Sequence, residues 1–201
     1  LRLFWLTLPC LCAARITVIS EATKKELLKW VRIPKDKISV IPVFISDAFQ
    51  VSETPKQFNT KSPVLLQVGT KPNKNLERVI DAIEGKIWVL EIVGILTDQQ
   101  RVLLNAKGIK FRNSVSLSES ELVARYQQCD VVVFASTYEG FGMPILEAQA
   151  TGKPVITSKI LSMPEVGGEG ACYVDPFRVD SIGAGIERIM ADREYREDLV
   201  R

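Results

Sequence analysis

The chain has 201 residues, of which 46% are hydrophobic and 25% are charged, and its formal net charge is +2. These fractions are typical of a globular protein, and the basic residues form neither a stripe nor a run with aromatic residues, so the charge pattern gives no reason to expect nucleic acid as a partner. The sequence contains no histidine, which removes the commonest general base and the commonest metal ligand. The length suits one large domain, or one domain and a piece of another.

Residues 1–14 are apolar and include two aromatic residues and a proline. The stretch is too short to span a bilayer, although it imitates the apolar core of a signal peptide because Ala13 and Ala14 end it. The sequence does not begin with Met, and a strand pattern follows at once over residues 16–20. We therefore expect residues 1–14 to be the last helix of an upstream domain, or the connection to it.

The four cysteines form no CxxC pair, and without histidine they match no familiar zinc spacing. Cys10 and Cys12 lie near the N-terminus, whereas Cys129 and Cys172 flank apolar strands and are expected to be core thiols. The simplest interpretation is a reduced, cytosolic compartment.

After the strand at residues 16–20, residues 21–31 have the pattern of an amphipathic helix. Residues 37–41 have the pattern of a second strand, which Pro42 ends. Residues 46–62 are polar and aperiodic, which indicates a linker or an excursion.

From residue 63 onward, short apolar runs alternate with helical patterns. The predicted strands are residues 63–68, 87–93, 109–111, 130–135, 154–157 and 172–174. The predicted helices are residues 75–84, 97–107, 118–128, 144–150 and 179–191, with an irregular loop over residues 159–170. This alternation predicts an α/β fold, a Rossmann-like parallel sheet with helices on both faces. Ligands of such sheets bind beyond the carboxyl ends of the strands, so we expect one shared edge for the loops at residues 69–74, 113–117, 136–143 and 158–170.

Glu139 and Glu147 flank a glycine-rich turn that opens a helix, in the order Glu-Gly-Phe-Gly-Met-Pro-Ile-Leu-Glu. Gly140 and Gly142 allow a tight turn and a close approach to a ligand, and Pro144 suits the start of a helix. The free amides of a helix start attract anions. The combination suggests a ligand that is both phosphorylated and hydroxyl-rich, such as a nucleotide sugar. The structural alternative is that the glycines and the proline only form an ordinary turn before a helix, and that Glu147 is favoured in a first helical turn by the helix dipole alone.

A second candidate site follows the strand at residues 63–68. Gly69 ends the strand, Lys71 and Lys74 follow it, and a helix begins near Asn75. A lysine beside a helix N-terminus is a natural partner of a diphosphate. The alternative is that both lysines are only solvated loop residues.

Other phosphate-binding motifs are absent from the sequence, which has no GxxxxGK[ST] loop, no GxGxxG after a predicted strand and no Asp-x-Asp pair. Charge on a leaving diphosphate would therefore have to be neutralised by lysine and by helix termini.

The stretch from Glu139 to Glu147 resembles the E-x7-E signature of retaining glycosyltransferases with the two-domain GT-B fold, specifically those of family 4. Residues 16–43, 66–83 and 148–176 are similar to further segments of this family in the same order, so the resemblance covers nearly the whole chain. It implies that residues 1–14 are the remnant of an N-terminal acceptor-binding domain or the connection to it. Residues 15–201 would then be the nucleotide-sugar-binding domain, without its C-terminal crossover helix.

The resemblance also implies roles for individual residues. Lys74 would contact the donor diphosphate, and Glu139, the expected catalytic residue, would bind hydroxyls of the transferred sugar. Glu147 would accept hydrogen bonds from the ribose. The complete expected donor-binding set is Gly69, Lys71, Lys74, Asn113, Ser114, Val115, Glu139, Gly140, Phe141, Gly142, Met143 and Glu147.

Within this set, the amides of Phe141, Gly142 and Met143 would meet sugar or phosphate oxygens, and the loop at residues 113–115 would pass the base. Glu165 and its loop would line the cleft.

Two positions depart from the family pattern. Thr70 stands where many members carry a phosphate-binding arginine, so either Lys71 replaces that contact or the contact is lost. Asn113 stands where a glycine is common, which leaves the choice of nucleotide open.

The expected activity is transfer of a hexose, such as mannose or glucose, from a nucleoside-diphosphate sugar to a glycan or lipid-linked acceptor, with retention and without a metal or other cofactor. This chain alone would bind the donor and transfer nothing. Two alternatives remain: a GT-B epimerase of the sugar nucleotide, which the lack of histidine disfavours, and a non-catalytic module that binds nucleotide sugars. The expected location is cytoplasmic, in polysaccharide biosynthesis, and peripheral association of the full-length protein with the inner membrane surface stays open.

Overall fold

The larger of two sheets is formed by the strands after residue 63. A computed structural model describes residues 3–201, so Leu1 and Arg2 of the expected remnant at residues 1–14 lie outside the described residues. The sheet has six strands in the order β5-β4-β3-β6-β7-β8, and all neighbouring pairs are parallel. The strands are β3 (Val64–Val68), β4 (Val89–Val93), β5 (Lys110–Ser114), β6 (Val131–Phe134), β7 (Val155–Ser158) and β8 (Cys172–Val174).

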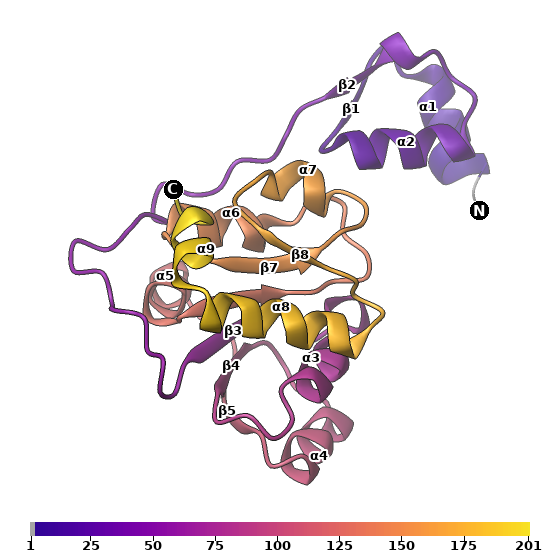
Figure 1. The fold of residues 1–201 in the computed structure, drawn as a ribbon. Helices are drawn as coiled ribbons and strands as arrows, with labels where there is room; N and C mark the ends of the chain where they lie inside the picture. Colours follow the sequence, from indigo (N-terminus) through magenta and orange to yellow (C-terminus); the bar gives the residue numbers. More distant parts are fainter. Residues whose placement is uncertain (1–2) are drawn as a thin grey trace.

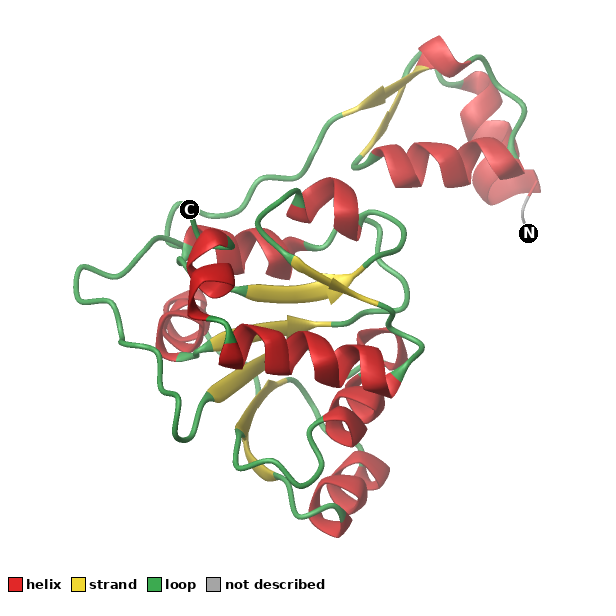
Figure 2. Ribbon diagram, viewed as in Figure 1, coloured by secondary structure: helices red, strands yellow, loops and turns green. Residues whose placement is uncertain are grey.

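Helices cover both faces of this sheet, as Figure 2 shows. They are α3 (Leu76–Ala82), α4 (Asp98–Ala106), α5 (Glu119–Gln128), α6 (Met143–Ala150), α7 (Met163–Gly167), α8 (Val179–Ala191) and α9 (Arg193–Asp198), with a 3-10 turn η3 (Pro72–Lys74) before α3. This arrangement confirms the predicted α/β fold with a doubly covered parallel sheet. No helix in the described range 3–201 is both long enough and apolar enough to cross a membrane.

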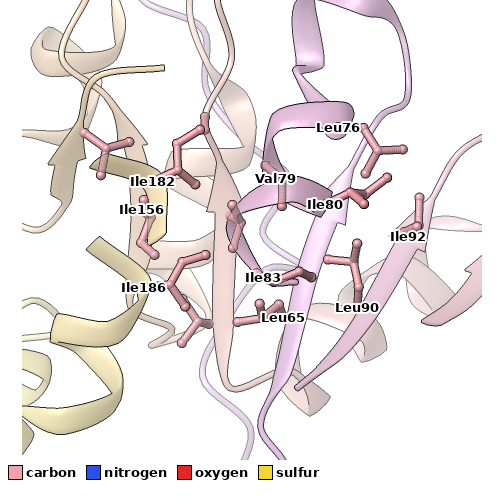
Figure 3. Packing of buried hydrophobic residues seen from close by; sticks show 14 of the residues in the cluster. Leu65, Leu76, Val79, Ile80, Ile83, Leu90, Ile92, Ile156, Ile182 and Ile186 are labelled. Atoms are coloured by element: carbon pink, nitrogen blue, oxygen red, sulfur yellow. The ribbon is translucent and has the colours of Figure 1, made fainter. Parts of the chain in front are cut away.

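The strand β6 illustrates why the sheet is buried on both sides. Val131 and Val133 point into one hydrophobic cluster, with residues of α3, α4 and α8. Val132 and Phe134 point into a second cluster, with residues of α5, α6 and α7. Because successive strand residues alternate between faces, a continuously apolar strand needs a cover on each face. Figure 3 shows the first cluster, in which side chains of α3 and α8 pack on β3, β4 and β7.

The N-terminal unit (residues 3–40) has its own small sheet, in which β1 (Ile16–Val18) pairs in parallel with β2 (Ile38–Val40). Its helical segments are η1 (Leu3–Thr7), α1 (Leu8–Cys12), α2 (Glu21–Trp30) and η2 (Lys35–Lys37). An extended connection leads from this unit to the larger sheet (Figure 1). The predicted linker at residues 46–62 contains no helix or strand, as expected.

This connection is fastened to the larger sheet at two places. The ring of Phe49 is buried and meets the edge of Tyr126, with 5.5 Å between ring centroids. The buried carboxylate of Asp130 accepts from Lys56 Nζ at 2.6 Å, from the amide of Asn59 at 2.9 Å and from the amide of Val64 at 2.8 Å. The connection is therefore packed on the domain along its second half.

Some of the predicted elements and boundaries were wrong. The strand predicted to end at residue 111 continues to Ser114, so Asn113 and Ser114 belong to β5 and not to a loop. Strand β5 lies at the edge of the sheet, where polar residues are tolerated and the apolar pattern is lost. The loop predicted at residues 159–170 contains α7, and α9 was not expected. Both helices are short, and short helices depend on packing more than on sequence propensity.

Candidate functional site

The loops after β3 and β6 meet at the carboxyl edge of the sheet, as predicted. The amide of Thr137 donates to the carbonyl of Asn73 at 2.8 Å, which joins the two loops through the backbone. Asn75, in the left-handed region with φ 62°, donates through its side-chain amide to the carbonyls of Ala135 at 2.9 Å and Pro176 at 2.7 Å. These contacts fix the start of α3 against the end of β6.

Lys74 and Glu139, predicted to act on the same ligand, form an ion pair with 2.7 Å between Nζ and Oε1. The same carboxylate oxygen accepts from the side-chain amide of Asn73 at 3.1 Å. The ammonium also lies 4.7 Å from the centre of the Phe134 ring, within the range of a cation–π interaction. The alternative of Lys74 as a solvated loop lysine is therefore wrong. Lys71 is exposed, and its ammonium takes part in no hydrogen bond or ion pair within residues 3–201.

Gly69 leaves room for the Lys74 side chain. Its φ is +95°, and a Cβ at this position would lie 2.9 Å from Lys74 Cγ. Its amide donates to the carbonyl of Val93 at 2.8 Å, which holds the turn against β4. Only glycine combines this conformation with the close passage of the lysine chain.

The site turn (residues 139–143) precedes α6. Gly142 is the N-cap residue of that helix and has φ 115°. Three successive carbonyls of the turn are held by hydroxyl groups: Ser162 Oγ donates to the carbonyls of Glu139 at 3.1 Å and Phe141 at 2.8 Å, and Ser20 and Thr23 donate to the carbonyl between them, that of Gly140.

The amides of Phe141 and Gly142 donate no hydrogen bond to any residue that the structure describes. They stand at the N-terminus of α6, where a helix presents free N–H groups and partial positive charge. The first turn of α6 contains no acidic side chain to compensate this charge. The turn can therefore bind an anion or the oxygens of a polar ligand.

Glu147 lies in the second turn of α6, and the alternative that placed it in a first helical turn is wrong. It is buried, and Tyr126 donates its hydroxyl to Oε2 at 2.5 Å. Burial raises the pKa of the Glu147 carboxyl, against the opposing effects of the Tyr126 hydrogen bond and the Lys74 charge. Burial and the neighbouring Glu147 raise the pKa of Tyr126 well above its usual range.

Tyr126 was missed by the sequence prediction, although it lies on the apolar face of the predicted helix at residues 118–128. A tyrosine among core residues needs a partner for its hydroxyl, and a buried carboxylate needs a donor. Those two requirements were the available signal for this pair.

The residues expected near the base are not joined to the Lys74–Glu139 pair by any contact within the described chain. The Asn113 side chain donates to the carbonyls of Ile92 at 3.1 Å and Gly94 at 2.8 Å, so it fastens β5 to the end of β4. The Ser114 hydroxyl donates to Glu91 Oε1 at 3.3 Å, and Val115 is exposed. Of these three side chains, those of Asn113 and Ser114 have internal partners, whereas that of Val115 is exposed.

Thr70 and Glu165 both have internal partners. The Thr70 hydroxyl donates to the carbonyl of Ile95 at 2.6 Å, so it binds the neighbouring loop. Glu165 lines a cavity of about 410 Å³ together with residues of α2. Its carboxylate accepts from the amides of Glu21 at 2.8 Å and Ala22 at 3.3 Å, and thus also caps that helix.

No group of three or more cysteine or acidic side chains comes together as a metal site within residues 3–201. The independence of metal stays a prediction.

Comparisons with known proteins agree on one family. The family model described as Glycosyl transferases group 1 matches residues 49–201, which is more than half of the chain. The chain is 29% identical over 208 residues to O-antigen chain mannosyltransferase B of Escherichia coli, covering 92% of this chain and 54% of the relative. It is 39% identical over 196 residues to MMP alpha-(1->4)-mannosyltransferase of Mycolicibacterium hassiacum, covering 90% of this chain and 46% of the relative.

Among solved structures, Alr3699/HepE of Anabaena in complex with UDP and glucose superposes with a TM-score of 0.84 at 17% identity. The superposition covers 96% of this chain and 58% of that protein. The chain spans about half the length of these two curated relatives.

Proposed function

Because this chain belongs to the group 1 glycosyltransferases, we propose that it forms the donor-binding part of a retaining enzyme of family 4 that uses a nucleoside-diphosphate sugar. One observation carries the proposal. The Lys74–Glu139 pair, the free amides of Phe141 and Gly142, and the buried Glu147 are gathered at the carboxyl edge of one parallel sheet. Cation, amide and carboxylate match diphosphate, sugar oxygens and hydroxyls, respectively.

In this proposal Lys74 moves from Glu139 to the donor diphosphate, and the N-terminus of α6 meets the sugar or phosphate oxygens through Phe141, Gly142 and Met143. Glu147 binds the ribose hydroxyls, and the backbone at residues 113–115 passes the base. Gly69 and Gly140 serve through their backbone, and Lys71 contributes charge at the entrance. These roles are consistent with the contacts described above.

The proposed mechanism is independent of metal and stabilises charge at both ends of the bond that breaks. Lys74 and the helix N-terminus neutralise the leaving diphosphate. Glu139 lies beside the transferred sugar, where its carboxylate stabilises an oxocarbenium-like transition state. Glu139 and Gly140 also line a cavity of about 280 Å³ between the site turn and α2, which offers room for substrate beside the carboxylate.

We propose a hexose as the transferred group. Mannose is the first candidate, because both relatives described above are mannosyltransferases. We propose a glycan or lipid-linked acceptor, which the similarity to an O-antigen chain enzyme supports. The acceptor would be bound by an N-terminal domain of the whole protein, with residues 15–201 serving the donor. We place the whole enzyme in the cytoplasm, peripherally associated with the membrane.

The test is a thermal-shift and calorimetry panel of UDP, GDP, ADP and their sugars against the 201-residue chain. A nucleoside diphosphate that binds the folded state should raise the melting temperature, and the rise should grow with the logarithm of the ratio of ligand concentration to Kd. Stabilisation by no member of the panel would contradict the proposal.

Transfer is then tested on a longer protein that carries the acceptor domain, because catalysis needs two domains to close over the donor. Release of nucleoside diphosphate together with a glycosylated acceptor indicates a transferase. Conversion of the donor sugar to its epimer would indicate the epimerase, and binding without either reaction a non-catalytic module. Robust transfer by the 201-residue chain alone would contradict the proposal that this chain forms only the donor-binding part of the enzyme.

A further inference from the structure

The N-terminal unit contacts the site turn directly. Helix α2 belongs to that unit and approaches α7 in the larger domain (Figure 1). Its N-cap residue, Ser20, is fully buried, although it lies at the junction of two units. A serine at a helix N-terminus is usually solvated, so its burial against residue 140 calls for a physical explanation.

The Ser20 hydroxyl has three hydrogen-bond partners, of which one is the Thr23 hydroxyl at 2.9 Å. As an acceptor it caps α2, receiving the amide of Thr23 at 3.0 Å. As a donor it uses its single proton on the carbonyl of Gly140, at 2.7 Å. The Thr23 hydroxyl donates to the same carbonyl at 3.1 Å. The hydroxyl groups of the α2 N-cap and of its first turn thus both lie within hydrogen-bond distance of one carbonyl of the site turn, and Ser20 makes the shorter bond.

Fixing this carbonyl also fixes the next amide. In a planar trans peptide the N–H points away from the C=O, so a Gly140 carbonyl held toward α2 turns the Phe141 amide away from α2. The hydrogen bond from Ser162 to the Phe141 carbonyl orients the Gly142 amide in the same way. Without these bonds the Gly140–Phe141 peptide would rotate easily, because glycine restricts the backbone least.

Helix α2 is held in place by a second contact. The carboxylate of Glu165, on α7, accepts from the amides of Glu21 and Ala22 at 2.8 and 3.3 Å. A carboxylate is favoured at the positive end of a helix dipole. The contact with Glu165 therefore helps to hold the start of α2 where the Ser20 hydroxyl can reach the Gly140 carbonyl.

We propose that Ser20 is a positioning residue for the nucleotide-sugar site, acting through the Gly140 peptide to present the Phe141 amide to donor oxygens. Thr23 supports it through the same carbonyl. The inference deepens the proposed function and rests on it. It means that the N-terminal unit contributes to donor binding without touching the donor.

The experiment compares four variants of the whole chain by calorimetry with a nucleoside diphosphate, its sugar and the bare nucleoside. Ser20→Ala and Ser20→Ala/Thr23→Val remove the hydroxyl groups, Thr23→Val alone preserves the cap of α2, and Ser20→Thr restores a hydroxyl. Ser118→Ala is the matched control, because Ser118 caps α5 in the same way, accepting from the amide of Glu121 at 3.3 Å, and its hydroxyl makes no hydrogen bond with the site turn.

We expect Ser20→Ala to weaken binding of the diphosphate and its sugar about three- to tenfold, the effect of one lost hydrogen bond, and the double variant to weaken it more. Nucleoside affinity should not change. Ser20→Thr should bind nearly like the parent, and Ser118→Ala should lose stability by a similar amount yet keep parental affinity. Thr23→Val should weaken binding slightly with the fold intact, so the inference can be tested even if Ser20→Ala unfolds.

Parental affinity in the double variant, or an equal loss for the nucleoside, would overturn the positioning role while leaving the donor site in place. Absence of nucleoside-diphosphate binding by the parent chain would overturn the proposed function, and this inference with it.

Discussion

Lys74 Nζ lies 2.7 Å from Glu139 Oε1, so the cation proposed for the diphosphate and the carboxylate proposed for the sugar neutralise each other within the protein. Each is more than three-quarters buried, with side-chain exposures of 20% and 15%. A partly buried charge that loses its partner is costly. If Lys74 binds the diphosphate as proposed, donor binding exchanges one ion pair for another, and the two residues should be energetically coupled.

Lys74→Met should weaken nucleoside-diphosphate binding by about 1–3 kcal/mol, the range of a hydrogen bond that involves charged groups. Nucleoside affinity should stay unchanged, because the nucleoside lacks the phosphates. Calorimetry with both ligands measures the difference. Lys86→Met is the control, since its exposed pair with Glu187 lies outside the site. Equal losses for nucleoside and diphosphate would mean that Lys74 is structural.

Glu139→Gln should leave the affinity for the plain diphosphate unchanged or slightly raised, because the amide no longer competes for Lys74. It should weaken binding of the nucleotide sugar, and in a complete enzyme it should mainly lower kcat. Titrating the diphosphate and its sugar against the variant separates the two effects. A loss shared equally by both ligands would contradict a role at the sugar.

Glu147→Gln should lower affinity for ribonucleotides and hardly affect 2′,3′-dideoxy analogues, since charge strengthens hydrogen bonds from vicinal hydroxyls. The variant keeps an acceptor for the Tyr126 hydroxyl, so its fold should persist. Calorimetry with each pair of nucleotides measures the contrast. Equal losses for both analogues would contradict ribose recognition.

The same variant should change the pH dependence of stability. Burial raises the pKa of Glu147 above its ordinary 4.5 in the folded state. The folded protein then binds this proton more tightly than the unfolded chain, so ionisation removes stability as the pH rises from the unfolded to the folded pKa. The free energy of unfolding of Glu147→Gln, relative to the parent, should increase from about pH 4 to about pH 7. Urea unfolding of both proteins at both pH values measures this difference, and a value of variant minus parent that stays constant or falls as the pH rises would contradict the burial effect.

Gly69→Ala should reduce both stability and diphosphate affinity. Its φ of +95° strains an alanine, and the new Cβ would lie 2.9 Å from Lys74 Cγ, so the lysine must move. Gly85→Ala is a matched control, because φ is +74° there and no atom lies within 4 Å of the added Cβ. It should lose about 1 kcal/mol of stability, as expected for alanine at positive φ, and keep its affinity. Unfolding and calorimetry on both variants give the comparison; equal affinities would mean that Gly69 does not position Lys74.

The sequence predicted the central sheet because its strands are short, apolar and bounded by glycine and proline. β6 is the clearest case, since all four of its residues are buried. Lys74 was expected to lie near the site turn, because loops that follow parallel strands meet at the same edge of the sheet. By contrast, the polar edge strand β5 carries little hydrophobic pattern, and its extent depends on pairing with β4.

Partners far apart in the chain could not be predicted. Tyr126 and Glu147 lie on different helices, and no local pattern joins them. Ser20 is recognisable as an N-cap, but its bond to Gly140 depends on how the N-terminal unit meets the larger domain. Asn113 was expected beside a base, whereas its amide serves the backbone of β4. Such roles are decided by the packing that tertiary structure imposes.

The contacts that hold the connection on the larger domain indicate where two related enzymes could be joined into a chimera. Phe49 and Lys56 bind the connection to the larger domain, whereas Ile41 and Phe44 are exposed. A crossover placed at residues 41–44 would exchange the upstream half and leave every anchor of the donor half intact. On the proposed role of Ser20, an incoming half would also have to bring a hydroxyl residue opposite Gly140 and helix amides within reach of the Glu165 carboxylate. The residues at the start of α2 are therefore the first place to judge whether two parents are compatible.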